Sequence, residues 1–297
     1  MPLRLRRRPE VKASTRRRWL LVYNCQVMGL ANCLNLSCDE IEVEHYDPAG
    51  FRAQSAALLK RMGEFERILV APQLETEVAA HVKACPAAWI VPTITFDAYH
   101  PDLCYLMEAG KALKGPMGDY HSLIAYAAFR SGCTPQEARS LYREAVYAEL
   151  GYLDRWDRAR VMLLDTFRQR DFPLDARQVG WSRNEPFMYS VNHPRIHCVR
   201  DVARCILERA GLEAAYADAL PHDNLANGPI FPVYPEIASA LSVSGSYLFK
   251  RGGQYSFLRL PEFVDASFDL YRNRAISIHP KYEQSLGLAM QVVEASR

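Results

Sequence analysis

The sequence contains little that assigns a function at first sight. None of its apolar runs approaches the roughly 18–20 residues that a membrane-spanning helix needs, so no such helix is predicted. Nothing repeats at the period of a solenoid, which excludes a repeat architecture. The lack of a C-x-x-C pair, an H-E-x-x-H motif and a glycine-rich dinucleotide fingerprint argues against a metal site and a Rossmann cofactor.

The 297 residues have the composition of an ordinary folded protein of one or two domains, with 49% hydrophobic and 24% charged residues. Eight cysteines are scattered along the chain, at positions 25, 33, 38, 85, 104, 133, 198 and 205. Their spacing favours a reduced, cytoplasmic protein in which most cysteines are buried as small hydrophobic residues. A chemical role for any one of them therefore needs a separate argument.

The formal net charge of +2 conceals two oppositely charged parts. Residues 1–18 contain eight Lys and Arg against one Glu, a balance of +7, whereas the rest of the chain has 28 cations and 33 acids, a balance of −5. We predict a basic arm over residues 1–16 that meets either phosphate groups or an anionic membrane surface, unless it is only a solvated tail. Nucleic acid is not an expected partner, because the body is acidic and no binding motif follows.

The arm ends in a pattern similar to a twin-arginine export signal. Residues 15–18 are Thr-Arg-Arg-Arg, and the apolar residues 19–21 follow. Asn24 and Gln26 then interrupt the apolar stretch, and no small-residue cleavage site precedes the acidic Asp39. We therefore expect the protein to stay in the cytoplasm.

Strands alternate with helices over residues 17–104, which is the pattern of a small parallel α/β subdomain. Apolar runs of strand length occur at residues 19–23, 41–46, 67–71 and 88–91, and helical spacing occurs at residues 26–36, 51–62 and 75–84.

Helical periodicity dominates after residue 105. It occurs at residues 120–131, 135–150, 152–169, 195–210 and 286–294, and the Pro- and Gly-rich residues 221–261 suit loops with a hairpin. The predicted fold class is α/β, with the small parallel subdomain embedded in a larger, mainly helical region over residues 105–297. No linker is polar enough to separate the two, so we expect one compact unit.

Asn24-Cys25-Gln26 follows the first predicted strand, where ligands gather in parallel α/β units. A cysteine at the start of a helix is expected to have a lowered pKa, and Asn or Gln side chains can donate hydrogen bonds to a developing oxyanion. The alternative is that Cys25 is a buried structural residue.

His100 and Asp102 lie in the loop after the fourth predicted strand. A carboxylate can fix the tautomer of an imidazole, so the two residues are candidates for a base and its orienting partner. The alternative is that Pro101 holds a turn and Asp102 caps the next helix.

Three further segments offer polar side chains near helix starts or turns. His121 follows a Gly-Pro turn, and Lys250-Arg251 forms a basic turn suited to phosphate. Asn192 and His193 precede Pro194, which suits the first position of the next helix. Each has a plain alternative as a surface or loop residue. His193 and His197 have the spacing of a helical metal pair, but no third ligand accompanies them, so no metal is predicted.

Taken in order, four short motifs give the chain a resemblance to the WcbI family of capsular polysaccharide biosynthesis proteins. They are Asn24-Cys25-Gln26, Tyr99-His100-Pro101-Asp102, Gly118-Asp119-Tyr120-His121-Ser122 and Asn192-His193-Pro194. The resemblance covers residues 24–194 directly. Tyr23 departs from it, because many relatives have glycine before the Asn-Cys-Gln turn.

The resemblance implies a coenzyme A-binding acetyltransferase that moves an acetyl group from acetyl-CoA to a sugar hydroxyl. It also implies an α/β subdomain built into a larger helical fold, a sugar or sugar-nucleotide acceptor, and a place near the inner membrane surface with the capsule machinery.

For this reaction the general base is assigned to His100, oriented by Asp102, or to His193. Cys25 either accepts the acetyl group or lines the thiol end of the pocket. The candidate donors and coenzyme contacts are Asn24, Gln26, His121, Asn192, Lys250 and Arg251. Two other functions stay open: a Cys/His esterase or deacetylase, and a scaffold that binds the ligand without turnover.

Overall fold

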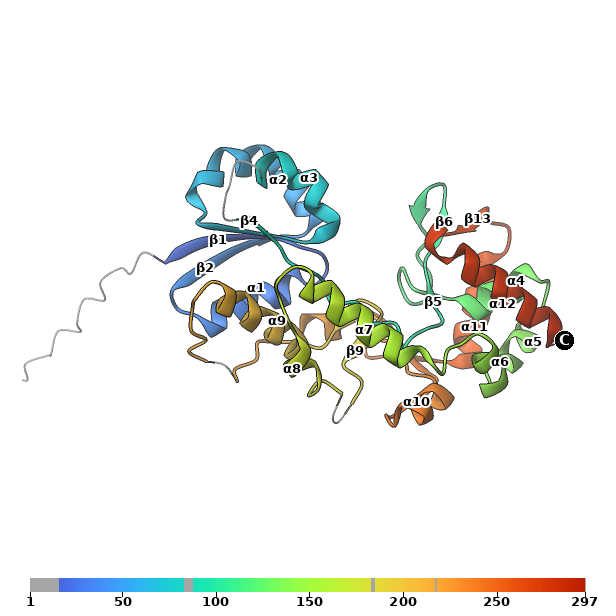
Figure 1. Cartoon of the computed structure of the whole chain (residues 1–297). Coiled ribbons are helices and arrows are strands. Elements are labelled where there is room, and N and C mark those ends of the chain that lie inside the picture. Colours follow the sequence, from blue (N-terminus) through green and yellow to red (C-terminus); the bar gives the residue numbers. More distant parts are fainter. Residues whose placement is uncertain (1–15, 83–87, 183–184, 217, 297) are drawn as a thin grey trace, which may run out of the picture.

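The computed structural model describes residues 16–82, 88–182, 185–216 and 218–296 (Figure 1). Residues 1–15, which make up most of the predicted basic arm, and Cys85 lie outside these ranges. The four strands of the first half are β1 (Arg17–Val22), β2 (Ile41–Tyr46), β3 (Arg67–Val70) and β4 (Ala88–Ile90), and the helices between them are α1 (Val27–Ser37), α2 (Pro48–Arg61) and α3 (Glu75–Val82).

The strands form one parallel sheet in the order β2-β1-β3-β4. Trp19 to Val22 are completely buried in the central strand β1, as expected of a parallel strand covered on both faces. The sequence prediction of a mixed α/β fold with a parallel sheet is confirmed.

Helices cover both faces of this sheet. Figure 1 shows α2 and α3 on one face and α1 with α9 (Ile196–Arg209) on the other. α9 is far from α1 in sequence, and the two pack closely at Gly29, where a β-carbon would lie 3.2 Å from Cδ1 of Ile196. The helix that completes the subdomain therefore comes from the second half of the chain.

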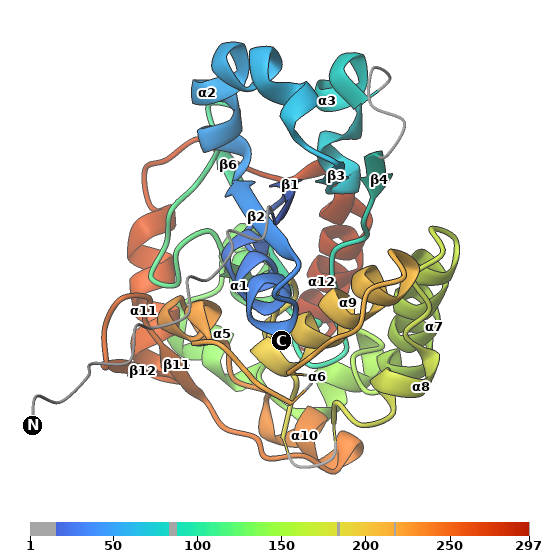
Figure 2. The same cartoon turned by 90° about the vertical axis from the view of Figure 1, so that its left-hand side faces the viewer.

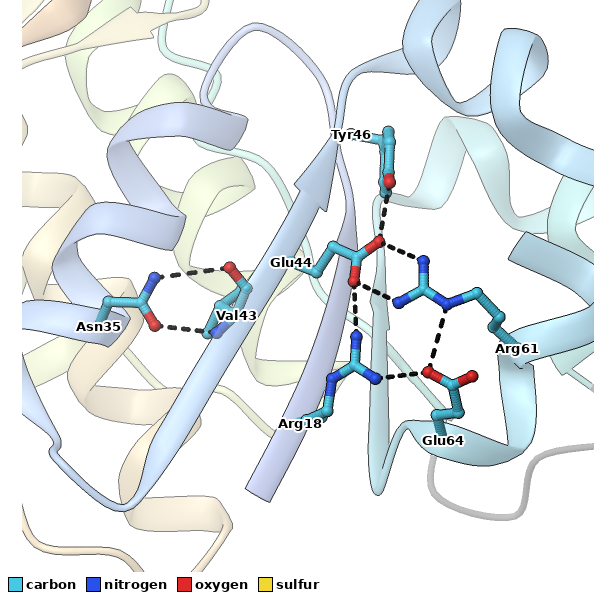
Figure 3. A network of polar contacts seen from close by, with 7 residues as sticks. All are labelled: Arg18, Asn35, Val43, Glu44, Tyr46, Arg61 and Glu64. Carbon is cyan, nitrogen blue, oxygen red and sulfur yellow. Dashed lines mark hydrogen bonds and ion pairs between the residues drawn. The ribbon is translucent and has the colours of Figure 1, made fainter. Parts of the chain in front are cut away.

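Val43, in the outer strand β2, has both its backbone N–H and its carbonyl occupied by a side chain (Figure 3). The Asn35 side chain of α1 accepts from the Val43 N–H (2.9 Å) and donates to the Val43 carbonyl (3.5 Å). Such pairing protects an edge strand from joining another chain.

An ion-pair network covers the neighbouring surface. Glu44 bonds Arg18 (2.9 Å) and Arg61 (3.0 Å), and both arginines also contact Glu64 (Figure 3). Arg17 forms ion pairs with Glu40 and Glu66. The last two cations of the basic N-terminal stretch thus belong to β1 and are neutralised within the fold.

The second half is mainly helical and carries short antiparallel strand pairs. Its helices are α4 (Leu123–Arg130), α5 (Pro135–Ser140), α6 (Glu144–Glu149), α7 (Arg155–Arg168), α8 (Asp175–Gln178), α10 (Pro235–Leu241), α11 (Leu260–Tyr271) and α12 (Glu283–Ala295), with one-turn segments at Asn224–Asn227 and Pro280–Tyr282. Two further one-turn segments, Met62–Glu64 and Pro72–Leu74, belong to the first half. Its strands are β5 (Leu103–Cys104), β6 (Leu106–Glu108), β7 (Lys111–Ala112), β8 (His121–Ser122), β9 (Met188–Ser190), β10 (His193–Pro194), β11 (Leu248–Lys250), β12 (Phe257–Arg259) and β13 (Ile276–Ile278).

The buried apolar side chains of both halves form one continuous cluster that includes Trp19 and Val293. In Figure 2, α2 and α3 lie at one end of the molecule and α10 at the other. None of the helices in the described ranges is both long and apolar enough to cross a membrane.

Two sequence predictions of helix boundaries are wrong. The helix expected over residues 135–150 is broken at Arg143, whose backbone is extended, and the break allows the Tyr142 hydroxyl to pair with Ser122 in the core. Pro194 does not begin a helix, because it lies in β10 and α9 starts at Ile196.

Candidate functional site

A cavity of about 580 Å³ lies beyond the carboxyl ends of β3 and β4. Gln73 follows β3, and Thr93 and Thr95 follow β4, so the sheet contributes one wall. α7 and the start of α12 contribute the others. This is the place where parallel α/β sheets bind ligands, as the sequence analysis expected.

Two cations line the cavity. Arg155, at the start of α7, forms an ion pair with Asp97 (2.8 Å). The Lys281 ammonium lies 4.7 Å from the ring centre of Tyr105 and 4.6 Å from that of Tyr282. No ion pair to Lys281 occurs within the described ranges, and desolvation lowers its pKa, although Asp97 and Cys104 oppose this effect.

The sequence analysis did not identify Arg155 or Lys281. A signal was present for Lys281, which precedes the expected helix at residues 286–294. A lysine at a helix N-terminus interacts unfavourably with the helix dipole, so its presence there indicates a role other than stabilising the helix.

The Gln26 side chain connects three loops by hydrogen bonds. Its side-chain amide donates to the carbonyls of Ile94 (2.8 Å) and Asn192 (3.0 Å) and accepts from the Ile94 N–H (3.2 Å). The side chain is 2% exposed. This corrects the prediction that Gln26 donates to a reacting group, because both of its amide atoms are already occupied.

Cys25 is the one exposed cysteine among the seven in the described ranges. Its sulfur lies 3.8 Å from both the carbonyl oxygen and Nδ2 of Asn192. Desolvation by the surrounding loops raises the pKa of the thiol to about 11, and the N–H groups of Cys25 and Gln26 only partly oppose this. The predicted lowering of the pKa is therefore wrong, and the burial expected by the alternative is wrong too.

Tyr120, Asn192 and His193 form a polar cluster next to Cys25. The Tyr120 hydroxyl donates to Oδ1 of Asn192 (2.6 Å) and lies 3.2 Å from Nε2 of His193. Because that hydroxyl has only one proton, Nε2–H of a neutral His193 is the donor to Tyr120, which leaves a lone pair on Nδ1. Nδ1 is buried and has no hydrogen-bond partner among the described residues, and desolvation lowers the pKa of His193 to about 4.

His100 has the same arrangement and lines the cavity. Its Nε2 lies 2.9 Å from the carbonyl of Phe231, which can only accept, so Nε2 carries the proton. Nδ1 is buried, and no group in the part of the chain that the structure describes bonds it. Desolvation lowers the pKa of His100 to about 4, against the opposing effect of the Phe231 hydrogen bond.

Asp102 does not orient His100, which corrects the sequence prediction. Its carboxylate accepts from the Ile124 N–H (2.9 Å) and from the hydroxyls of Tyr152 (3.3 Å) and Tyr234 (2.7 Å). Ile124 lies in the first turn of α4, so Asp102 bonds the start of this helix, although the N-cap residue is Ser122, whose side chain accepts from the Ala125 N–H. Desolvation raises the pKa of the Asp102 carboxyl to about 6.

Three other predicted contacts lie away from the cavity lining. His121 is buried between the Leu113 carbonyl (2.9 Å) and the Tyr271 hydroxyl (3.3 Å), and the Lys250 ammonium donates to the carbonyls of Ala226 and Gly228. The prediction that His121 and Lys250 hold the coenzyme is corrected, because their polar atoms hold the fold together. Arg251 is exposed, and its role stays a prediction.

The described residues contain no group of three His, Cys, Asp or Glu side chains that could hold a metal ion.

Comparison with known proteins relates the fold to one family. A family model described as polysaccharide biosynthesis enzyme WcbI matches residues 18–215. A solved structure is described as WcbI, a novel polysaccharide biosynthesis enzyme, in its native form without a disulfide bond between coenzyme A and a cysteine. It has a TM-score of 0.63 and 16% sequence identity, over 94% of this chain and 99% of that chain, which shows a common fold. No curated protein matches the chain.

Proposed function

The chain belongs to the WcbI family of polysaccharide biosynthesis enzymes, and from this premise we propose that it transfers an acetyl group from acetyl-CoA to a sugar hydroxyl during capsular polysaccharide synthesis. The observation that carries the proposal is the exposed Cys25 thiol, which lies 3.8 Å from Asn192, the residue before the neutral His193, at the ligand edge of the sheet. The solved relative is described in terms of coenzyme A and a cysteine, and Cys25 is the candidate for that position here.

The residues present fit a coenzyme A molecule. The cavity of about 580 Å³ is within the ordinary range of ligand sites. Lys281 supplies a cation that has no ion-pair partner among the described residues, and Ser285 brings the first turn of α12 to the same wall. We assign the coenzyme phosphates to this wall and the thiol end to Cys25.

Acetyl-CoA supplies an activated acyl group, and the chain supplies a proton acceptor. Both His100 and His193 are held as the Nε2–H tautomer, in which Nδ1 has no partner within the described ranges and is the atom that can take a proton from an acceptor hydroxyl. Either residue therefore suits the base, and His100 lines the cavity directly.

Two amides can stabilise negative charge that develops on the acyl carbonyl oxygen. Nδ2 of Asn192 points toward the Cys25 sulfur, at 3.8 Å. Asn24 uses Oδ1 to accept from the Gln26 N–H (3.0 Å), and its Nδ2 has no partner within the described ranges. We therefore assign stabilisation of the oxyanion to Asn24 and Asn192 in place of Gln26.

The raised pKa of Cys25 favours direct transfer over a covalent acyl-cysteine. With a pKa of about 11, only about one thiol in ten thousand is ionised at neutral pH, and the thiolate is the nucleophilic form. We therefore assign Cys25 to the wall around the coenzyme thiol.

A ligand titration tests coenzyme binding. We expect coenzyme A and acetyl-CoA, but not a sugar nucleotide alone, to raise the melting temperature of the full-length protein.

Lys281→Gln removes one charged contact and is expected to weaken coenzyme binding by about 10- to 100-fold. Lys111→Gln, at an exposed lysine of β7, is the matched control and is expected to bind as the wild type does. Equal binding by both variants would contradict the placement of the phosphates.

A further inference from the structure

The hairpin of β11 and β12 carries apolar side chains on its outward face. Its inward face packs against the core, because Phe249 is completely buried and stacks on Phe263 with ring centres 4.1 Å apart. On the outward face Leu248 is 48% exposed and Phe257 56%, and Tyr255 in the connecting loop is 95% exposed. Strand alternation predicts polar residues at these positions, so the fold does not explain them.

The same hairpin carries only positive charge. Residues 248–260 contain Lys250, Arg251 and Arg259 and no acid. The Lys250 ammonium donates to a backbone carbonyl of the protein, whereas Arg251 and Arg259 are exposed and have no ion pair within the described part of the chain. The next acid along the chain, Glu262, accepts from the Arg259 backbone N–H.

The tip is held in place by the body of the protein. Lys250 donates to the carbonyls of Ala226 and Gly228, its backbone pairs with Ile230, and the Gly253 N–H donates to Asn227 (2.8 Å). The apolar side chains of this tip are thus presented on a fixed support beside α11 (Figure 2).

The size of the patch argues against a second copy of the chain as its partner. A fully exposed large apolar side chain offers on the order of 150–250 Å², so three partly exposed ones offer roughly 300–500 Å². A stable protein interface buries about 800 Å² on each side. Aromatic rings flanked by arginines, in a small rigid patch, suit instead the boundary of a bilayer that contains anionic lipid.

We propose that Leu248, Arg251, Tyr255, Phe257 and Arg259 form a docking surface for an anionic bilayer. The aromatic rings enter the interfacial region and the two arginines pair with lipid phosphates. This inference is independent of the proposed acetyl transfer.

Sedimentation with vesicles tests the proposal. The full-length protein is expected to bind vesicles of phosphatidylcholine mixed with phosphatidylglycerol, and to bind vesicles of phosphatidylcholine alone far less. Tyr255→Ser/Phe257→Ser and Arg251→Gln/Arg259→Gln are each expected to lower binding to the mixed vesicles at least tenfold. Val161→Ser/Tyr216→Ser, at residues that are 53% and 55% exposed elsewhere, is expected to bind as the wild type does.

The basic arm is tested separately by deletion of residues 1–12, and the hairpin substitutions are expected to lower binding in that background too. Unchanged vesicle binding by the hairpin variants would overturn the proposal, as would a wild-type dimer in solution that the same variants dissociate. Wild-type melting temperatures for the variants would establish that they are folded.

Discussion

At the scale of single residues, His100 and His193 are held in the same way. In each ring Nε2 forms a hydrogen bond, and Nδ1 is buried with no partner among the residues that the structure describes. The partners are protein groups that cannot ionise near neutral pH, namely the Phe231 carbonyl and the Tyr120 hydroxyl. Both rings are therefore neutral over the physiological range, which is the state that a base requires.

The pH dependence of acetyl transfer follows from this arrangement. With a pKa of about 4, the base is expected to stay deprotonated down to mildly acidic pH, so kcat/KM should be flat through neutrality and fall only toward that value. Replacing the base, by His100→Ala or His193→Ala, is expected to lower kcat by about 100-fold or more. A fall in kcat/KM centred near the ordinary histidine pKa of 6.5, or full activity in both variants, would contradict the assignment.

The raised pKa of Asp102 predicts that its contribution to the free energy of unfolding decreases as pH rises. Its pKa is raised from 3.8 to about 6 in the folded protein, so the folded state binds its proton more tightly. The associated stability is fully present below pH 3.8 and is lost as pH rises through about 6, an effect of roughly 3 kcal/mol.

Chemical denaturation across this pH range measures the effect. Asp102→Asn cannot titrate, so the difference in unfolding free energy between wild type and variant is expected to change with pH by about this amount, with the wild type relatively more stable in acid. The lowered pKa values of the two histidines act in the other direction, but they cancel in this difference. A difference that stays constant with pH would contradict the raised pKa.

At the scale of elements, the cavity depends on Gln26, which connects the turn before α1 to the loops after β4 and β9. Gln26→Ala leaves the buried Ile94 N–H and two carbonyls without this partner, and is expected to lower the unfolding free energy by about 2–4 kcal/mol. Gln254→Ala, in the exposed hairpin loop, is the control and is expected to change it by less than about 0.5 kcal/mol. Equal stability of both variants in urea denaturation would show that Gln26 is not structural.

The parallel sheet was predictable from sequence because its strands are buried on both faces and form continuous apolar runs. Trp19 to Val22 and Ile68 to Val70 are the clearest cases. α11 was missed although its signals were present: Pro261 lies in the first turn, Glu262 caps the Arg259 N–H, and apolar residues recur at helical spacing. The Gly-containing segment before it directed the interpretation toward loops.

The site was only partly predictable, because its contacts join residues far apart in the chain. The sequence analysis identified Cys25, His100, Asn192 and His193, which are polar residues beside predicted turns. It misjudged Gln26 and Asp102, because nothing local shows that Gln26 reaches Ile94 or that tyrosines enclose Asp102. The pKa of Cys25 is raised mainly by desolvation from other loops. A prediction based only on the position of Cys25 at a helix start does not include this effect.

At the scale of the whole molecule, the two halves share one hydrophobic core and one cavity. The sheet supplies one wall, and α7 and α12 from the second half supply the others, so the ligand site exists only when both halves are folded together. The family match covers residues 18–215, whereas the structural likeness extends over 94% of the chain. Lys281 therefore lies outside the part of the chain that the family model matches.

The most direct test of the account is the release of free coenzyme A from acetyl-CoA by the purified full-length protein, measured with and without a panel of sugar nucleotides. We predict release that depends on an acceptor, acetylated sugar as the product, and retained activity in Cys25→Ala with no acetyl group on the wild-type protein by intact mass. Release that needs no acceptor would identify a hydrolase instead. No release with any acceptor, or complete loss in Cys25→Ala together with an acetylated wild-type cysteine, would contradict direct transfer.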